Sequence, residues 1–307
     1  MKAAIIEQHG GPDVLRLGEV PDPEPAAGEV VVDVHAASVN AADWKVRQGP
    51  SNPAKRFPYV MGRDFSGVVS ALGEGVSGLV EGQPVFGVCE TAIEGAYAEK
   101  VAIAAGIVAP KPDAVSHLEA AALALTGLTA VVSVEHTLEL RAGERILIQG
   151  GAGGVASFAI QLAKHIGAHV ITTASASNHD FLRELGADQV VDYNMQDFTQ
   201  VVSGCDAVFD TVGGDVATRS FQVLKPGGRA AFIASGPTAV PSPRDDVRSL
   251  RPAVGRERRH LERVMALVEQ GAVRIPPLQV FPLPQAAEAH RISEGRHLRG
   301  KLVLQVR

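Results

Sequence analysis

Residues Arg145 to Gly167 read RILIQGGAGGVASFAIQLAKHIG, an apolar run followed by a glycine-rich turn and a second apolar pattern. The first run, Ile146 to Ile148, is typical of a buried strand. After the turn, apolar residues recur at the spacing of an amphipathic helix. They are Val155, Ala159, Leu162, Ala163 and Ile166. Gly167 stands where a helix commonly ends, so the stretch predicts a strand, a tight turn and a helix.

The turn fits the pattern G-x-G-x-x-G/A, which is a fingerprint of dinucleotide binding. We assign the tight turn to Gly151, the approach of a pyrophosphate to Gly153 and close packing of helix on strand to Ala156. Free N–H groups at the start of the helix, around Gly154 and Val155, favour phosphate. An ordinary strand-to-helix turn can carry the same glycines, but the flanking strand and helix supply the context that the fingerprint requires.

Short strands and helices continue to alternate after this turn. Further strands are predicted at 169–174, 189–191, 206–210 and 229–234. This alternation predicts a doubly wound α/β fold with a parallel sheet, whose ligands bind at the carboxyl ends of the strands. The cofactor-binding residues predicted in the segments after these strands are Ser175, Ser177, Asn178, Tyr193, Val212, Gly213 and Ser235.

The first 120 residues show a different pattern. Short β-type runs at 30–36 and 67–73 are separated by proline and glycine, which predicts a mainly antiparallel, β-rich domain. The tail from Gly300 to Arg307 is another strand-like run, and we expect it to return to this first domain. The predicted domains are therefore 1–122 with 259–307, and 123–258.

The composition is that of an ordinary soluble globular protein. The chain has 307 residues, 46% hydrophobic and 21% charged, which is enough for about two domains. We see no apolar run that approaches a membrane span, and the formal net charge of -5 gives no reason to expect nucleic acid. Two cysteines, Cys89 and Cys205, fit a reducing compartment. We therefore expect a cytoplasmic protein without a membrane or nucleic-acid partner.

Arginines are concentrated between residues 243 and 263. Such a cluster could bind nucleic-acid phosphates. Aspartates and glutamates are interleaved with it, however, and no aromatic residues accompany it for base stacking. We interpret the segment as a solvated loop and helix face.

Segments over nearly the whole chain resemble the medium-chain dehydrogenase/reductase superfamily, in particular its zinc-free quinone oxidoreductase branch, which includes zeta-crystallin. Besides the glycine turn, they are VNAAD at 39–43, MGRDFSGVV at 61–69, GAYAE at 95–99, ALTGLTA at 124–130, DAVFDTVGG at 206–214 and GRHLRGK at 295–301. The resemblance implies a GroES-like substrate domain, a Rossmann domain, an active site in the cleft between them and a homodimer. It also implies cofactor contacts from Asn40, Thr126 and Arg296.

The resemblance also implies that no metal is bound. Zinc-dependent relatives carry Gly-His-Glu where this chain has Gly62, Arg63 and Asp64, and a catalytic cysteine where it has Asn40. Catalytic zinc takes three His, Cys or carboxylate ligands, and arginine has no lone pair to offer. A structural zinc lobe of four cysteines is impossible in a chain that has two.

The residues after the second predicted strand favour NADPH over NADH. An NAD-preferring site places a carboxylate there for the ribose 2′-hydroxyl, whereas this chain has no acid before Asp180. The hydroxyls of Ser175 and Ser177 and the amide of Asn178 can donate to a 2′-phosphate. Quinone oxidoreductase relatives also use a tyrosine that matches Tyr193, together with a basic residue that this chain lacks. Ser177 or Asn178 could instead cap the next helix, a role compatible with ligand contact.

Four residues are candidates for the chemistry. Asn40 can donate to a developing oxyanion and Arg63 can stabilise it as a fixed cation, although a structural salt bridge is an equal alternative for Arg63. Trp44 and Tyr59 can form an aromatic wall for a flat substrate or simply pack. Cys89 is expected to be a buried, inert residue.

We therefore predict a zinc-independent, NADPH-dependent oxidoreductase that transfers hydride to a quinone or a similar conjugated carbonyl. A second hypothesis is reduction of an activated C=C bond in an alkenal or enoyl thioester, which needs a proton donor that the sequence does not reveal. A third is a non-catalytic protein that binds NADPH. Fold alone does not separate them, because function depends on the site.

Overall fold

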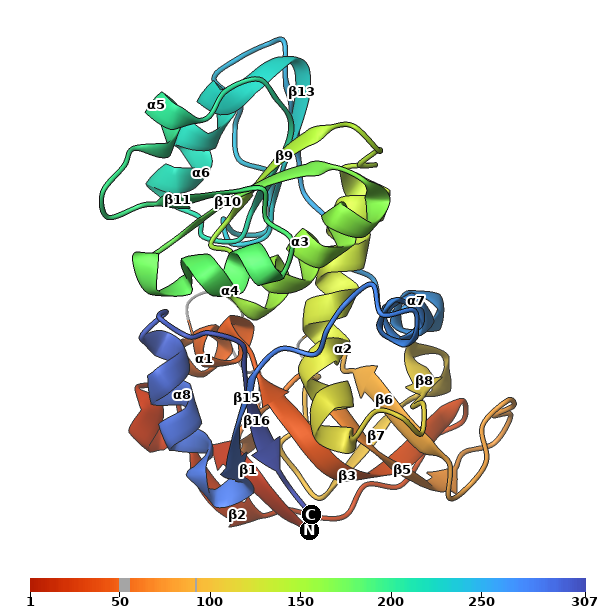
Figure 1. Cartoon of the computed structure of the whole chain (residues 1–307). Helices are drawn as coiled ribbons and strands as arrows, with labels where there is room; N and C mark the ends of the chain where they lie inside the picture. Colours follow the sequence, from red (N-terminus) through yellow and green to blue (C-terminus); the bar gives the residue numbers. More distant parts are fainter. Residues whose placement is uncertain (50–55, 92) are drawn as a thin grey trace. The chain divides into compact units, whose positions relative to one another are not determined.

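The computed structural model describes residues 1–49, 56–91 and 93–307, and the chain divides into two compact units (Figure 1). Unit 1 consists of Met1–Leu125, Arg256–Met265 and Ile275–Arg307. Unit 2 consists of Thr126–Gly255 and Ala266–Arg274. The short C-terminal segment 266–274, which the predicted boundaries place in the first domain, thus clusters with the second unit.

Unit 2 is built on a six-stranded parallel sheet in the order β11-β10-β9-β12-β13-β14. Its strands are β9 (Arg145–Gln149), β10 (His169–Ala174), β11 (Gln189–Asp192), β12 (Cys205–Asp210), β13 (Leu224–Phe232) and β14 (Arg248–Leu250). The chain winds outward from β9 in one direction and then from β12 in the other, so the strand order reverses between these two strands. The predicted doubly wound fold is confirmed.

Helices in unit 2 connect these strands (Figure 1). They are α3 (Gly154–Ile166), η4 (Ala176–Asn178), α4 (His179–Glu184), α5 (Phe198–Val201), α6 (Asp215–Arg219) and η5 (Ser220–Val223). As predicted, α3 ends at Gly167, whose φ of 94° is left-handed. The core contains buried apolar residues of sheet and helices, among them Leu147, Val208, Phe221 and Phe232.

Unit 1 contains two sheets, and all strand pairs except β15–β16 are antiparallel. The small sheet has the order β2-β1-β4, with β1 (Lys2–Ile6), β2 (Arg16–Glu19) and β4 (Tyr59–Val60). The large sheet has the order β15-β16-β3-β5-β6-β8, and β7 also pairs with β3. Its strands are β3 (Glu29–Val39), β5 (Asp64–Leu72), β6 (Pro84–Val88), β7 (Lys100–Ala104), β8 (Val108–Pro110), β15 (Leu278–Pro282) and β16 (Lys301–Gln305).

The C-terminal tail returns to the first unit, as expected. Strand β16 pairs antiparallel with β3, and Val303 lies opposite Ser38. The pairing brings Lys301 next to residues that follow β3, more than 250 positions earlier in the chain. Helix α1 (Ala41–Gln48) continues directly from β3 and contacts α8 (Ala286–Glu294) (Figure 1). The remaining helical segments are η1 (Pro12–Val14), η2 (Ala105–Ile107), α7 (Arg258–Glu269) and η6 (Leu283–Gln285).

One helix corrects the expectation that no apolar run approaches a membrane span. Helix α2 (His117–Val131) and the π-helical turn η3 (Val132–Thr137) form 21 continuous residues that are apolar and long enough to cross a membrane. The structure buries 78% of the most apolar window. A core helix shows the same composition and burial, so the helix is weak evidence for a membrane.

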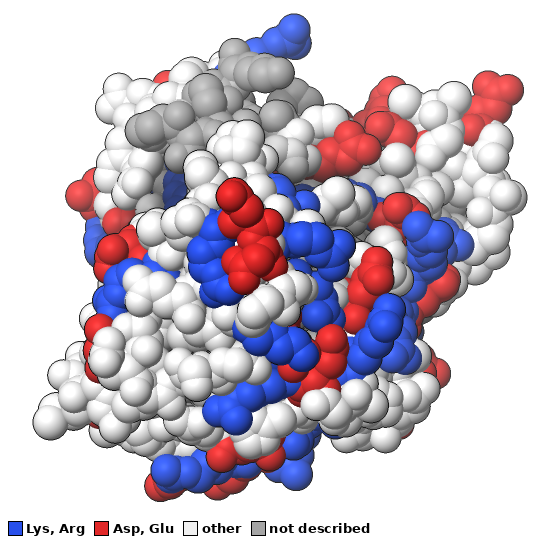
Figure 2. Space-filling view, turned by 90° about the horizontal axis from the view of Figure 1, so that it is seen from above, with Lys and Arg blue, Asp and Glu red and all other residues white. Residues whose placement is uncertain are grey.

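The arginine-rich segment, predicted to be a solvated loop and helix face, contains strand β14 and the start of helix α7. The strand was not predicted. Arg244 donates to the carbonyls of Phe221 and Leu224, and Arg251 donates to that of Phe232. These arginines therefore satisfy backbone carbonyls of unit 2. On the face shown in Figure 2, basic and acidic residues are interspersed, without a broad area of one sign.

Candidate active site

The glycine turn after β9 has the backbone that a phosphate site needs. The left-handed residue is Gly150, with φ 75°, rather than Gly151, to which the sequence analysis assigned the tight turn. A Cβ on Gly151 would lie 2.3 Å from the Thr172 Oγ1 atom, so Gly151 is required because β10 packs closely against the turn. Ala156 is fully buried, in agreement with close packing of α3 on the sheet.

Open space lies over Gly153, the N-cap residue of α3. A Cβ built there would contact only the carbonyl oxygen of Gly150, at 3.5 Å, and no side chain caps the helix. The N–H groups of Gly154 and Val155 are in the first turn of α3 and have no partner within the helix. A phosphate anion fits these donors and the positive end of the helix dipole. The residues present therefore fit the pyrophosphate of a dinucleotide.

Ser175, Ser177 and Asn178 form one polar group directly after β10. The amide of Asn178 donates to Ser175 Oγ at 3.1 Å, and the Ser175 and Ser177 hydroxyls lie 3.3 Å apart. Strand β11 pairs in parallel with β10, so Tyr193 follows the neighbouring strand at the same edge of the sheet, and it is 49% exposed. The structure thus brings together the residues predicted to contact the adenosine ribose and its 2′-phosphate.

The loop after β12 is organised by a carboxylate. Asp210 is fully buried and accepts hydrogen bonds from the backbone N–H groups of Val212 and Gly213 at 3.1 and 2.9 Å. Gly213 has φ 82°, which disfavours any other residue there. Ser235 follows β13, and its buried hydroxyl has no hydrogen-bond partner among the described residues. Predicted site residues thus follow the carboxyl ends of five parallel strands, β9 to β13.

Thr126, a predicted cofactor contact, is the first residue of unit 2. It lies inside α2 and is 4% exposed. The structure therefore makes it part of a packed helix.

Asn40 is 9% exposed and lies between β3 and α1 in unit 1. Its amide nitrogen donates to Asp64 Oδ1 at 2.9 Å and to the Ser38 carbonyl at 3.3 Å, while its oxygen accepts from Lys301 Nζ at 2.7 Å. Both amide hydrogens are thus already used within the unit. A substrate oxyanion would have to displace one of these bonds. The predicted donor role of Asn40 therefore requires the loss of a hydrogen bond within unit 1, which the sequence did not reveal.

Asp64 accepts hydrogen bonds from Asn40 and from two further residues. Besides Asn40, it accepts from Ser38 Oγ at 2.9 Å and from the Leu125 N–H at 3.3 Å. Burial raises the pKa of Asp64, while the charge of Lys301 opposes the rise. Burial likewise lowers the pKa of Lys301, against the charge of Asp64. The opposite charges of Asp64 and Lys301 thus partly offset the effect of burial on the pKa of each group.

Arg63 takes part in the salt bridge that was the alternative to a catalytic role. Its Nε lies 2.9 Å from Glu94 Oε1 and 3.8 Å from Asp43 Oδ1, and its side chain is 13% exposed. Its two terminal nitrogens make no hydrogen bond within the described part of the chain. The structure therefore shows a cation anchored by two carboxyl groups, with two nitrogens left for an anionic group.

The structure brings Arg296 and Trp44 together. The Arg296 guanidinium lies 5.4 Å from the centroid of the Trp44 ring, a cation–π distance, and Arg296 has a left-handed φ of 55°. Trp44 is only 6% exposed, so most of its ring packs in unit 1. Tyr59 is half-buried, and its hydroxyl has no hydrogen-bond partner among the described residues. Tyr59 therefore has more surface to offer a flat substrate than Trp44.

Several residues of this site were not predicted. Asp43, Glu94 and Lys301 were not among the predicted site residues. Asp43 does cap α1, because its Oδ2 accepts from the Asn40 N–H at 2.8 Å. The position of Glu94 directly before the GAYAE segment was a signal that it could belong to the site. The sequence does not show, however, that this acidic side chain is buried.

Cys89 is buried, and burial raises its pKa above the usual range. The expectation of an inert thiol agrees with this environment.

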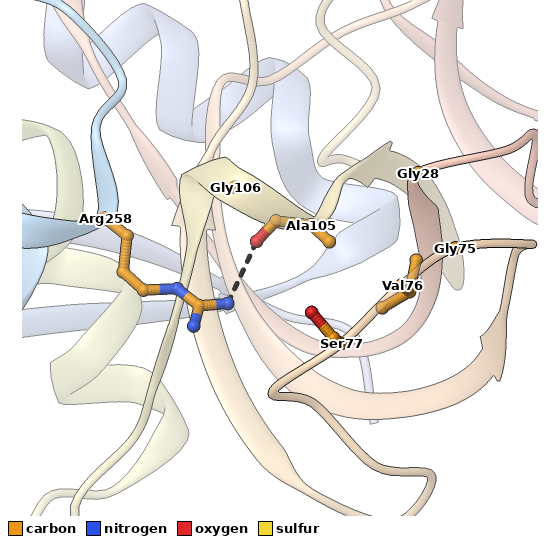
Figure 3. A pocket seen from close by; sticks show the side chains of 7 residues that line it. All are labelled: Gly28, Gly75, Val76, Ser77, Ala105, Gly106 and Arg258. Carbon is orange, nitrogen blue, oxygen red and sulfur yellow. Dashed lines mark hydrogen bonds between the residues drawn. The ribbon is translucent and has the colours of Figure 1, made fainter.

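A pocket of about 380 Å³ lies elsewhere in unit 1 (Figure 3). It is lined by Gly28, Gly75, Val76, Ser77, Ala105, Gly106 and Arg258. Arg258 donates to the carbonyls of Val108 and Ala105 at 2.6 and 3.0 Å. None of the predicted site residues lines this pocket, so we assign it no part in the reaction.

The fold and the site together define a class of protein. A β-rich unit with a GroES-like arrangement, joined to a doubly wound unit with a phosphate-binding turn, is the architecture of medium-chain dehydrogenases/reductases. The family model described as "Alcohol dehydrogenase GroES-like domain" matches residues 26–113, and the one described as "Zinc-binding dehydrogenase" matches residues 185–304.

Known proteins resemble the chain over its whole length. The quinone oxidoreductase from Coxiella burnetii is 37% identical, with a TM-score of 0.93 over 100% of this chain and 99% of that one. The Escherichia coli quinone oxidoreductase, solved in complex with NADPH, is 28% identical, with a TM-score of 0.91 over 100% of both chains. The chloroplastic NADPH-dependent alkenal/one oxidoreductase of Arabidopsis thaliana is 34% identical over 99% of this chain and 79% of its own length. The chain belongs to the quinone oxidoreductase branch of the medium-chain dehydrogenase/reductase superfamily and is an NADPH-dependent oxidoreductase.

Proposed function

We propose that this protein transfers hydride from NADPH to a quinone or a similar conjugated carbonyl without the help of a metal. When bound, NADPH supplies the hydride. The observation that carries the proposal is the open, uncapped turn at Gly153, combined with a polar group rather than a carboxylate after β10. The turn and the start of α3 hold the pyrophosphate, and Ser175, Ser177 and Asn178 hold the 2′-phosphate, with Tyr193 beside them.

The groups of unit 1 act on the substrate. An acceptor that takes hydride becomes anionic at oxygen, and fixed donors and cations stabilise such an anion. We assign this role to the two terminal nitrogens of Arg63, which make no hydrogen bond to the described residues. Asn40, held by Asp64 and Lys301, fixes the shape of the site. Tyr59 offers an aromatic face to a flat acceptor.

Reduction of an activated C=C bond is the alternative reaction. It is favoured by the similarity to an NADPH-dependent alkenal/one oxidoreductase. A panel of quinones, alkenals and enoyl thioesters, each assayed by the oxidation of NADPH, separates the two reactions by their values of kcat/KM. Absence of turnover with every acceptor would favour the third hypothesis, a protein that binds NADPH without catalysis.

Cofactor preference can be tested at the end of β10. Ala174 is 3% exposed, so a carboxylate there would be buried, whereas Ser175 is half-buried and already part of the polar group. We expect Ser175→Asp to weaken NADPH binding at least about tenfold, because about 1.4 kcal/mol of charge repulsion with the 2′-phosphate is enough for that factor. NADH has no phosphate there and should bind about as before. Titration of both cofactors measures this, and an equal loss for both would show that the group does not contact the phosphate.

We expect activity without a metal. Asn40 and Arg63 occupy the positions where zinc-dependent relatives carry ligands, and no group of three or more His, Cys, Asp or Glu residues suited to a metal exists in the described ranges. Elemental analysis of the purified protein should find less than stoichiometric zinc, and dialysis against a chelator should leave turnover unchanged. A reversible loss of turnover on chelation would contradict this part of the proposal.

Two further properties are part of the proposal. A homodimer is supported by the family resemblance, and the mass of the protein in solution tests it. A cytoplasmic location is supported by Cys89 and Cys205, which are both buried free thiols.

A further inference from the structure

Asp43 and Glu94 share a single cation. Arg63 Nε lies 2.9 Å from Glu94 Oε1 and 3.8 Å from Asp43 Oδ1, and both acidic side chains are 0% exposed. Two ionised carboxylates with one guanidinium would leave an excess negative charge where water cannot solvate it. Such a pair is favourable when one of the two carboxyl groups keeps a proton.

Hydrogen bonding gives a second, independent reason. Asp43 Oδ2 accepts from the Asn40 N–H at 2.8 Å and from the Tyr97 hydroxyl at 2.9 Å. Asp43 Oδ1 and Glu94 Oε2 are buried and have no hydrogen-bond partner among the described residues. Buried polar atoms are almost always paired, so each of these two oxygens lacks a donor. A proton on either carboxyl group removes the negative charge that its unpaired buried oxygen would otherwise share.

The other charged groups around the pair are accounted for. The negative charge of Asp64 disfavours the ionisation of Asp43. The positive charge of Lys301 acts on both Asp64 and Asp43 and favours the ionisation of each. The charge of Arg256 acts on those of Arg63, Asp64 and Glu90, and its Nε donates to the Cys89 carbonyl. Burial, opposed by Arg63, raises the pKa of Asp43 to about 7 and that of Glu94 above its usual range.

Glu94 is held in this position by its backbone. It has φ 31°, in the left-handed region that a residue with a side chain rarely adopts. Strain of this kind persists where the surrounding structure imposes it, and it is concentrated at functional sites.

Tyr59 has a third buried oxygen without a partner. The residue is half-buried in β4, while its hydroxyl is buried and has no hydrogen-bond partner among the described residues. Glu94, Arg63 and Asp43 all act on its ionisation, so the hydroxyl lies within their electrostatic reach. A hydroxyl accepts and donates at the same time, and can therefore take a proton on one side while it releases its own on the other.

We propose that Asp43 and Glu94 hold one proton between them and release it, through the Tyr59 hydroxyl, to the substrate after hydride transfer. This inference rests on the proposed function. The hydride brings two electrons and one hydrogen nucleus, so a quinone becomes a hydroquinone anion and an enone becomes an enolate. The released proton forms the missing O–H or C–H bond and leaves both carboxyl groups ionised. Water then returns a proton to the pair.

The first test needs neither substrate nor turnover. The intact protein, with ¹³C-labelled aspartate and glutamate carboxyls, is titrated by NMR. We expect one buried protonated carboxyl at pH 6 whose signal changes as the pH rises through about 7, in accordance with the pKa of Asp43. Asp43→Asn, which mimics the protonated acid, and Glu94→Gln should each abolish this signal. Ionised carboxyl groups throughout at pH 6 would overturn the proposal.

The second test is the pH profile of kcat with an enone. Wild-type kcat should fall as the pH rises through about 7, because the pair then loses its proton. Asp43→Asn and Tyr59→Phe should lower kcat at pH 6 about 100-fold, the lower end of the range for general acid catalysis, and remove the dependence on pH. A control is Asp33→Asn, which changes a carboxylate of the same unit that is paired with Arg307. Its profile should match the wild type.

The two tests fail in different ways. A structural role alone would change stability without changing the shape of the pH profile, so an unaltered profile in Asp43→Asn or Tyr59→Phe overturns the proton transfer. If no acceptor is reduced by the wild type, the proposed function is wrong, whereas the shared proton is still decided by NMR.

Discussion

Gly153→Val should lower the affinity for NADPH by at least about 100-fold while the protein stays folded. The backbone of Gly153 has φ -72° and ψ 155°, an extended conformation that valine adopts readily. A Cβ at this position meets only the Gly150 carbonyl at 3.5 Å, an ordinary contact, so the substitution causes no clash within the protein. The branched side chain would instead occupy the space over the N-terminus of α3. Loss of pyrophosphate contacts worth about 2.7 kcal/mol corresponds to the expected factor.

A matched control separates this effect from a general effect of valine. Gly11 also has a negative φ, of -67°, and nothing lies within 4 Å of a Cβ built on it. Gly11→Val should therefore bind NADPH like the wild type. Calorimetric titration measures both affinities, and thermal unfolding checks both folds. Wild-type affinity in a folded Gly153→Val protein would mean that the cofactor does not approach this turn.

Lys301→Met should destabilise unit 1 by about 3–5 kcal/mol, the usual cost of removing one member of a buried charged group. The Nζ atom donates to the Val39 carbonyl at 2.9 Å and to Asn40 Oδ1 at 2.7 Å, and Lys301 is 3% exposed. Methionine fills a similar volume but donates no hydrogen bond. It would leave two buried acceptors unpaired and the charge of Asp64 without its main opposing charge.

The only tryptophan of the chain makes this measurement specific to one unit. Trp44 belongs to unit 1 and is 6% exposed, so its fluorescence reports the unfolding of that unit in urea. The double variant Lys301→Met, Asp64→Asn removes the unbalanced charge and should recover part of the lost stability. An unchanged urea midpoint in Lys301→Met would show that the charge of Lys301 does not hold this site together.

The cofactor half of the site could be predicted because its chemistry is local in the sequence. The turn that opens α3 is a few consecutive residues, and helix and strand periodicity on either side identify it. Ser175, Ser177 and Asn178 lie within four positions, and Tyr193 follows the next strand along the chain. Parallel strands bring such segments to one edge of a sheet, so the alternation of elements was enough to group them. Within this turn, the sequence placed the tight bend at Gly151, whereas the left-handed residue is Gly150.

The substrate half could not be predicted in the same way, because its partners are far apart in the chain. Lys301 reaches Asn40 across 261 positions, through the antiparallel pairing of β16 with β3. Arg63 meets Glu94 across 31 positions. The sequence by itself determined the doubly wound fold, the phosphate turn and the residue types available for chemistry. Only the tertiary structure decided which amide hydrogens of Asn40 are used and which carboxyl groups are buried with one cation, because burial and hydrogen bonding depend on contacts between distant segments.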